Sequence, residues 1–506
     1  MQPVWRNLSD PIFERAIACP GAVALAEGDV PLNYRALADL VGRASAHVHD
    51  LGIEPGEPVA LALPGGLDHV LLTFALLRVG AVPLEMAPRP VPLAMAALLR
   101  RLRVRRAFLA PQLPSVDTIT SHVIGPNWRA DLAHTAGDRR VARDQDAPHM
   151  LHIGCGPDGM PHAIVTTHRQ WLARLDAMRR LLPDVVTPGR PPVLVLPGTQ
   201  GHSALLFLMC QFGLGGRTLV AAGDLSAARL AGTLEAAGDA IGLLSPALFR
   251  ALLAMPAVPG GRLPRLRGLF TGGRALRPDE KLAVAGRLTP NLYTLHASAA
   301  AGVVAVLAPA ALAVHPASAG MVDPVLTFEV VDGEGRMQPP GVAGRVRLRG
   351  PGVAQGTVGA SAAAAGFRDG WYYPDELGAL APSGLLRLTG RASLLVRRRG
   401  VDIPLPEVER LLRMHASVAA AAAVDLRAPG GETLLIGLVV SREAPAPEAL
   451  AAHCRSAIPA ALQPDRIHFV RTLPTGADGG PDRVLLRRLL VRAAQRLNGA
   501  PPGGNA

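Results

Sequence analysis

Lysine is almost absent from this 506-residue sequence, since Lys281 is the only one. The net charge of +12 therefore comes from arginine. Aromatic residues make up only 4% of the chain and do not alternate with the arginine clusters at 100–106 and 397–399. A surface that stacks nucleic-acid bases needs such interleaving. We therefore expect no nucleic-acid partner. The arginine clusters indicate solvated helix faces or contacts to small phosphate-bearing molecules.

Cysteine is also scarce, with four residues scattered along the chain without paired spacing. This spacing predicts no disulfide framework and fits a reducing compartment. The longest apolar run, 299–314, contains Pro309 and is shorter than the ~20 residues that span a bilayer, so we expect buried sheet and loop there and no membrane span. Asp10, Glu14 and Arg15 have no apolar block behind them, which predicts no secretory signal and a cytoplasmic protein.

The length of the chain exceeds the ~250 to 300 residues at which single cores stop growing, so we expect a large and a small domain. Short apolar strands alternate with helical patterns, as at 58–63 followed by 68–79, which predicts an α/β fold. Short alternating strands with glycine turns then predict a small β-rich subdomain, and a further change of pattern predicts an α+β domain. The expected limits are 1–389 for the large N-terminal domain, with the β-rich subdomain at about 322–389, 390–498 for the C-terminal domain, and 499–506 for a disordered tail.

A glycine-rich turn at 152–169, HIGCGPDGMPHAIVTTHR, follows a predicted strand. Glycine lets backbone N–H groups come close to an anion, so this turn is a candidate phosphate loop. A plain glycine-rich connection between two strands is the alternative. The candidate phosphate-loop residues are Gly154, Cys155, Gly156, Asp158, Gly159 and His162.

Two other kinds of site can be drawn from the same segment. His149, His152, Cys155 and His162 have spacings that resemble a metal site. Structural zinc sites usually take ligand pairs from separate turns, so we expect no metal here. Cys155 with a histidine base is a second alternative, as a nucleophile. Histidines on a strand and a loop, with no further role, are the third.

Thr167, His168 and Arg169 complete a pattern that resembles the phosphate loop of the adenylate-forming (AMP-binding) superfamily, of the acyl-CoA synthetase and adenylation-domain type. The glycines of the turn agree with that pattern. His162 stands where the family has a lysine. Asp158 places a negative charge where triphosphate oxygens would lie, which is unfavourable by Coulomb repulsion.

The resemblance continues over nearly the whole chain, from Leu32-Asn33-Tyr34 to Leu473-Pro474. It implies that His202 lines an acyl pocket, although a capping or core histidine explains this residue equally well. It implies that Ser393 occupies the hinge before the C-terminal domain. The nucleotide-binding residues that it implies are Gly272, Gly273, Arg274, His296, Ser298, Glu376 and Arg391.

Three charged groups of the family pattern are replaced in this sequence. Ala300 stands for the glutamate that helps to hold Mg²⁺, and a methyl group cannot coordinate a hard cation. Gly480 stands for the lysine that closes the adenylation site, and the nearest basic residue, Arg483, needs a loop shift to reach that place. Removing one preorganised charge costs about 10² to 10³ in rate, so the three replacements at His162, Ala300 and Gly480 together predict a loss of about 10⁴ or more.

The resemblance implies ATP-dependent activation of a small carboxylic acid as an acyl-adenylate, followed in some relatives by transfer to CoA or an acyl carrier protein. Its cofactors are ATP/AMP and Mg²⁺, the latter with a weakened or absent role here. The replaced groups favour impaired or altered catalysis. The alternative is an inactive relative that serves as a binding or regulatory partner in a biosynthetic pathway.

Overall fold

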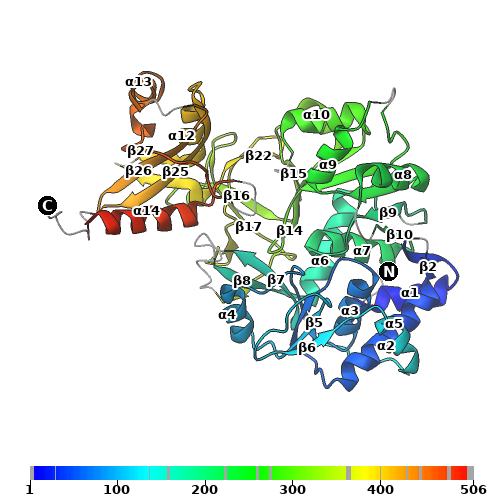
Figure 1. Ribbon diagram of the computed structural model, residues 1–506. Helices are drawn as coiled ribbons and strands as arrows, with labels where there is room; N and C mark the ends of the chain where they lie inside the picture. The colour runs from blue at the N-terminus through cyan, green and yellow to red at the C-terminus, as the bar shows by residue number, and fades with distance from the viewer. Residues whose placement is uncertain are drawn as a thin grey trace. The chain divides into compact units, whose positions relative to one another are not determined.

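The computed structural model describes most of the chain (Figure 1). The described residues are 5–28, 30–135, 137–155, 160–187, 189–221, 225–257, 261–272, 276–359, 366–398, 401–428, 431–443, 447–475 and 480–498. They form two compact units. The first runs to Pro374 and includes 378–388, and the second includes 375–377 and the described residues from Thr389 onward.

A seven-stranded sheet carries the first part of the large unit, in the order β18-β8-β7-β4-β3-β5-β6. Its strands are β3 Pro58–Ala62, β4 Val82–Glu85, β5 Arg106–Leu109, β6 Thr120–Val123, β7 Pro148–Cys155, β8 Pro161–Thr167 and β18 Gly356–Val358. The strands from β3 to β7 are parallel, and β7 and β8 form an antiparallel hairpin. The hairpin carries the glycine-rich segment.

A second sheet of the same unit joins a parallel half to an antiparallel half, with the strand order β19-β20-β17-β21-β22-β15-β14-β13-β12-β11-β9-β10-β1-β2 and β16 beside β17. The parallel half and its edge strand are β1 Val23–Glu27, β2 Val30–Asn33, β9 Val193–Leu196, β10 Thr218–Val220, β11 Ala240–Leu243, β12 Gly268–Gly272 and β13 Leu292–Ser298. The antiparallel half is β14 Gly302–Leu307, β15 Gly320–Val322, β16 Thr327–Val331, β17 Gly344–Arg349, β19 Phe367–Arg368, β20 Trp371–Tyr372, β21 Leu377–Leu380 and β22 Leu385–Gly390.

One hydrophobic core connects the two sheets through a set of helices. The helices of this unit are α1 Asp10–Ala18, α2 Tyr34–Asp50, α3 Leu67–Arg78, α4 Leu93–Arg101, α5 Trp128–Asp131, α6 His168–Leu181, α7 His202–Leu214, α8 Ala227–Ala237, α9 Pro246–Leu253, α10 Pro278–Arg287 and α11 Pro309–Val314. Helix α7 has apolar residues on all sides and is buried along almost its whole length, as that composition requires. Helix α6 begins at a capping box formed by Thr167 and Gln170.

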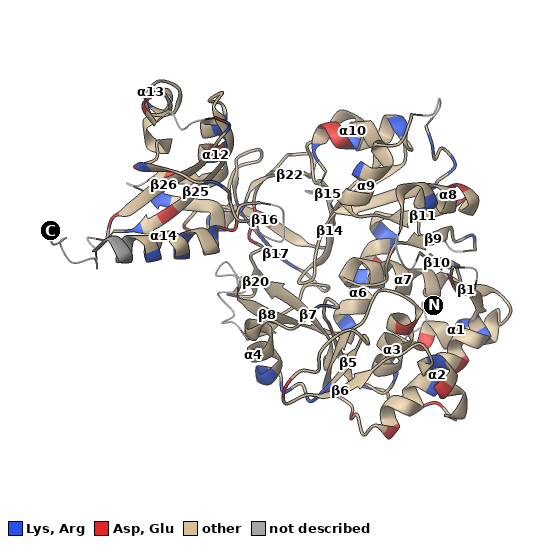
Figure 2. Cartoon of the chain, viewed as in Figure 1, with Lys and Arg blue, Asp and Glu red and all other residues tan. Residues whose placement is uncertain are grey.

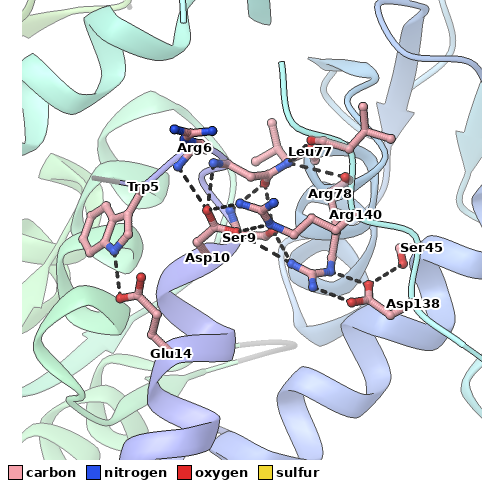
Figure 3. Close-up of polar contacts among 12 residues, drawn as sticks. Trp5, Arg6, Ser9, Asp10, Glu14, Ser45, Leu77, Arg78, Asp138 and Arg140 are labelled. Carbon is pink, nitrogen blue, oxygen red and sulfur yellow. Dashed lines mark hydrogen bonds and ion pairs between the residues drawn. The ribbon is translucent and has the colours of Figure 1, made fainter. Parts of the chain in front are cut away.

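A network of charged side chains holds α1 against the end of α3 (Figure 3). Arg78 is only 4% exposed, and its guanidinium binds both carboxylate oxygens of Asp138 and lies 3.9 Å from Asp10. Arg140 donates two hydrogen bonds of 2.8 Å to Asp10. A buried charge is costly unless it is paired, and here two carboxylates pair it.

The apolar run at 299–314 differs from the sequence expectation. Its middle forms β14, which is buried throughout, as expected. Its end forms α11 rather than a loop, because Pro309 occupies the first helical turn, where its missing N–H needs no partner. Across the described ranges, no helix combines the length and the apolar character needed to cross a bilayer.

The one lysine of the sequence lies on α10 and is buried. Lys281 donates from Nζ to the Ser318 carbonyl oxygen at 3.1 Å. Burial lowers the pKa of this amine to about 8. Lys281 is therefore a packed residue of α10, and its amine is turned away from solvent.

The second unit is a small α+β structure. A hairpin of β23 and β24 precedes a three-stranded sheet in the order β25-β26-β27. Its elements are β23 Leu395–Arg398, β24 Val401–Pro404, α12 Leu405–Arg413, β25 Val418–Arg427, β26 Thr433–Ser441, α13 Pro447–Ala457, β27 Arg466–Phe469 and α14 Arg483–Asn498. Arginines recur along α14 (Figure 2). The two units have the α/β and α+β character that the sequence predicts.

Candidate active site

The β7–β8 hairpin brings His162 against Gly154. The two residues are direct cross-strand partners, and a Cβ atom at Gly154 would lie 2.7 Å from the His162 Nε2 atom. A side chain at position 154 would therefore force the His162 ring to move, because the imidazole packs over Gly154. The predicted phosphate-loop residues Gly156, Asp158 and Gly159 lie outside the described residues, as does the side chain of Cys155.

The histidines of β7 are buried neutral side chains. Burial lowers the pKa values of His149 and His152 to about 3, with smaller contributions from nearby cationic groups. Within the described part of the chain, no three side chains of the kinds that bind metals come together. The rings instead pack against other rings, with His149 5.1 Å from His168 and His152 5.8 Å from Trp171 between centroids.

The carboxyl ends of β12 and β13 lie side by side in parallel register, with Gly272 opposite Leu295. Gly272 is exposed, and a Cβ atom added there would meet no atom of the described residues within 4 Å. This edge is where open α/β sheets bind ligands. His296 is buried within β13, and Ser298 ends it, accepting a hydrogen bond from the Ala301 N–H at 3.1 Å. Gly273 and Arg274 lie outside the described residues.

Ala300 lies in the turn between β13 and β14 and is fully buried. Its side chain belongs to an apolar cluster with Ile164, Ala354 and Phe367. Its carbonyl oxygen accepts hydrogen bonds from the Ala354 N–H at 2.7 Å and from Arg174 at 3.0 Å. A methyl group among apolar side chains, next to a guanidinium, does not fit Mg²⁺, which needs oxygen ligands.

Arg174 on α6 was not among the residues singled out in the sequence. It is 1% exposed and donates from Nε to the Gly352 carbonyl oxygen at 2.8 Å, from Nη2 to the Ala300 carbonyl oxygen and from Nη1 to His202 Nε2 at 2.8 Å. Burial lowers its pKa to about 9, so the guanidinium keeps its charge at neutral pH. The sequence signal was an arginine three residues after Trp171, on the buried side of an amphipathic helix.

His202 is the first residue of α7 and lies where the resemblance places an acyl-pocket histidine. Its ring centroid is 5.1 Å from that of Trp171 and 5.3 Å from that of His152. Burial, followed by the charge of Arg174, holds its pKa well below the usual value. A neutral ring with its proton on Nδ1 can accept at Nε2, so the hydrogen bond from Arg174 assigns this tautomer.

The segment before His202 is fixed by two buried titratable residues of the seven-stranded sheet and its helices. Glu85, at the end of β4, accepts the Gly201 N–H at 2.9 Å. His69, on α3, shares a hydrogen bond of 3.0 Å with the Thr199 hydroxyl. His69 Nε2 and Glu85 Oε1 are 3.6 Å apart. Strand β4 and helix α3 therefore help to fix the segment that leads into His202.

The small unit holds the remaining predicted residues. Glu376 is half-buried, and Arg391 is exposed just before the short helical turn Ala392–Leu394. Ser393 donates its backbone N–H to the exposed Asp375 at 2.6 Å, and its hydroxyl also bonds to that carboxylate. The nucleotide and hinge roles of these residues stay predictions.

Gly480 lies just before α14, and the nearest basic residue is not available to replace the family's lysine. Arg483 donates to Glu409 at 2.6 Å, and the two side chains are 13% and 5% exposed. Glu409 also accepts the Ala423 N–H at 2.9 Å. Arg483 therefore neutralises a buried carboxylate inside its own unit.

Two sequence families cover most of the chain. The AMP-binding enzyme family matches residues 12–357, and the AMP-binding enzyme C-terminal domain matches 407–479. The chain therefore belongs to the AMP-binding enzyme family, which confirms the resemblance and the fold class.

Named relatives extend this assignment. The salicyl-AMP ligase / salicyl-S-ArCP synthetase of Mycobacterium tuberculosis is 29% identical, over 96% of this chain and 91% of its own. The 2-hydroxy-7-methoxy-5-methyl-1-naphthoate–CoA ligase of Streptomyces carzinostaticus is 28% identical, over 83% of this chain and 81% of its own. Among solved structures, the amide bond synthetase McbA from Marinactinospora thermotolerans has a TM-score of 0.74 at 22% identity, covering 95% of this chain and 99% of that one. This likeness supports the fold.

Proposed function

We propose that this protein activates a small carboxylic acid with ATP. A carboxylate oxygen of the acid attacks the α-phosphorus of ATP, pyrophosphate leaves, and an acyl-adenylate forms. In a second step a thiol of CoA or of a carrier protein attacks the acyl carbon, loses its proton, and releases AMP. The observation that carries the proposal is the match of both family domains, together with relatives that are named as acid–AMP and acid–CoA ligases.

Residues of this chain have fitting roles in such a reaction. Among the described residues no atom crowds Gly272, which leaves room for a planar base at the edge of the parallel sheet. Ser298 borders the same edge. ATP supplies the leaving group. Ala300 provides no ligand to Mg²⁺, so we propose that dependence on this ion is weakened.

The acid is proposed to be aromatic. Three relatives carry names with salicyl or 2-hydroxynaphthoate groups. In this chain the rings of Trp171, His152 and His202 gather at the start of α7, and rings of this kind favour offset or edge contacts with an aromatic ligand. We retain 1–389 and 390–498 as the proposed domain limits, and a cytoplasmic location as a prediction from the sequence.

Acid-dependent exchange of labelled pyrophosphate into ATP tests the proposal, with a panel of aromatic and aliphatic acids. Exchange with one or more acids is the expected result. Absence of exchange with every acid, from protein that binds ATP in calorimetry, would contradict it. That result would favour the inactive relative, for which Ala300 and Gly480 are the supporting observations. A gain of exchange in Gly480→Lys would identify the missing lysine as the cause.

A further inference from the structure

Three arginines are almost completely buried in the described part of the chain: Arg78, Arg174 and Arg398, which are 4%, 1% and 8% exposed. Arg78 is paired with Asp138 and Asp10 (Figure 3). Arg398 is paired with Asp465. Among the described residues, Arg174 has no carboxylate within 4 Å. Arg174 is the most deeply buried of the three arginines, and the other two are each paired with an aspartate.

Arg174 is held in a specific place rather than left in a loose cavity. A Cβ atom at Gly302 would lie 2.8 Å from Arg174 Cγ, and one at Gly352 would lie 3.2 Å from it. The three acceptors of the guanidinium are two backbone carbonyl oxygens and one neutral imidazole nitrogen. A guanidinium has five N–H donors, so these three bonds leave two. The charge itself meets dipoles and no anion.

The surroundings of Arg174 contain a second polar atom that lacks a partner. His152 Nε2 is buried and makes no hydrogen bond with the described residues, while its ring lies 5.3 Å from that of His202. The Arg174 guanidinium lies 5.7 Å from the centroid of Trp171. A cation, an unpartnered imidazole nitrogen and an aromatic face thus lie around His202. His202 is intermediate in exposure, whereas Arg174, His152 and Trp171 are buried.

We infer that Arg174 is the counter-ion of a bound oxyanion, supplied by the carboxylate of an aromatic acid or by a phosphate. Burying an unpaired charge is unfavourable, and a ligand's negative charge offsets that cost on binding. The inference rests on the proposed function for the identity of its ligands. The site requires only equilibrium binding, however, and no turnover.

The test measures binding and thermal stabilisation without ATP turnover. The probes are salicylate and benzoate, the matched neutral salicylamide and benzamide, and inorganic phosphate. We expect at least one oxyanion to bind the wild-type protein and raise its melting temperature, and the amides to have little effect. Binding of the acids identifies a carboxylate site, and binding of phosphate alone identifies a nucleotide phosphate site.

Arg174→Met removes the charge at similar length, and Arg179→Met on the same helix is the control, since Arg179 is partly exposed and paired with Asp176. Because a hydrogen bond to a charged group contributes strongly to affinity, Arg174→Met should weaken oxyanion binding about 10- to 100-fold. The control variant Arg179→Met should bind the oxyanion as the wild type does.

The inference is overturned if acids bind no better than their amides and phosphate has no effect, a comparison that uses the wild-type protein alone and stands even where Arg174→Met does not fold. It is also overturned if Arg174→Met binds the oxyanion as tightly as the control does. Failure of pyrophosphate exchange with intact Arg174-dependent binding contradicts the proposed function and leaves this site in place.

Discussion

Ser393 is tied to Asp375 through both its backbone N–H and its hydroxyl. The pair connects the turn before β21 to the residue at the predicted hinge, and both residues belong to the small unit. A charged acceptor that takes two hydrogen bonds limits the backbone rotation available to Ser393.

Asp375→Ala should therefore loosen the predicted hinge. A net hydrogen bond contributes about 1 kcal/mol, which corresponds to about a fivefold change in a local opening equilibrium. We expect amide exchange at 392–394, followed by mass spectrometry, to accelerate about fivefold. Asp402→Ala, which removes an exposed pairing with Arg397, is the control. Unchanged exchange at 392–394 would show that the pair does not restrain the hinge.

Arg483→Met should destabilise the small unit, because it leaves the carboxylate of Glu409 buried without its partner. Breaking a buried pair from one side costs about 3 to 5 kcal/mol in unfolding free energy. Urea unfolding of the protein measures this loss. The double variant Arg483→Met with Glu409→Gln should recover most of it, since glutamine still accepts the Ala423 N–H. Equal stability of the single and double variants would contradict this role for Arg483.

Ala300→Glu should not restore the family's metal ligand by itself. The side chain at this position is fully buried among Ile164, Ala354 and Phe367, so a carboxylate there meets both steric overlap and desolvation. We expect a loss of about 1 to 3 kcal/mol in unfolding free energy. The matched control is Ala310→Glu on the exposed side of α11. A stable Ala300→Glu protein with increased Mg²⁺-dependent ATP binding would contradict the expectation.

Glu85→Gln should change how stability depends on pH. Burial raises the pKa of Glu85 to about 7, so its contribution to stability is complete below 4.5 and is lost as pH rises through 7. Burial lowers the pKa of His69 to about 4, so its contribution is complete above 6.5 and is lost as pH falls through 4. In the wild-type protein, the Glu85 and His69 contributions therefore change stability in opposite directions over nearly the same pH interval.

With Glu85 replaced, the His69 slope remains alone. Acidification from pH 6.5 to 4 should then cost the variant about 3 kcal/mol more than the wild type, given 1.36 kcal/mol per pKa unit. Chemical unfolding at a series of pH values measures the difference, with the exposed Glu54→Gln as control. Parallel curves for the variant and the wild type would show that the two residues do not titrate in this way.

The fold could be predicted from the sequence because its signals are local. Strand and helix alternation indicated the α/β unit, and the motifs from Leu32 to Pro474 carried the family resemblance, which the family matches confirm. The expectation of a loop at the end of the run 299–314 was wrong, because Pro309 begins helix α11 there. A proline that usually ends a helix can also begin one.

The surroundings of His202 could not be predicted in the same way. Arg174 donates hydrogen bonds to His202, which is 28 residues away in the sequence, and to the Ala300 carbonyl oxygen, which is 126 residues away. Neither separation is a helical or strand period, so no pattern in the sequence connects these residues. The resemblance placed Ala300 where the family has a charged glutamate. The structure adds that the Arg174 guanidinium donates a hydrogen bond to the Ala300 carbonyl oxygen.

Lys281 gives the molecule an unusual chemical surface. The sole side-chain amine is buried on α10 and bonded to the Ser318 carbonyl oxygen, so the folded protein offers no lysine to acylating reagents or to lysine-modifying enzymes. Any acylation of Lys281 must wait for α10 to detach. The rate of Lys281 acylation would therefore report the rate of local opening at the parallel half of the sheet, without an introduced label.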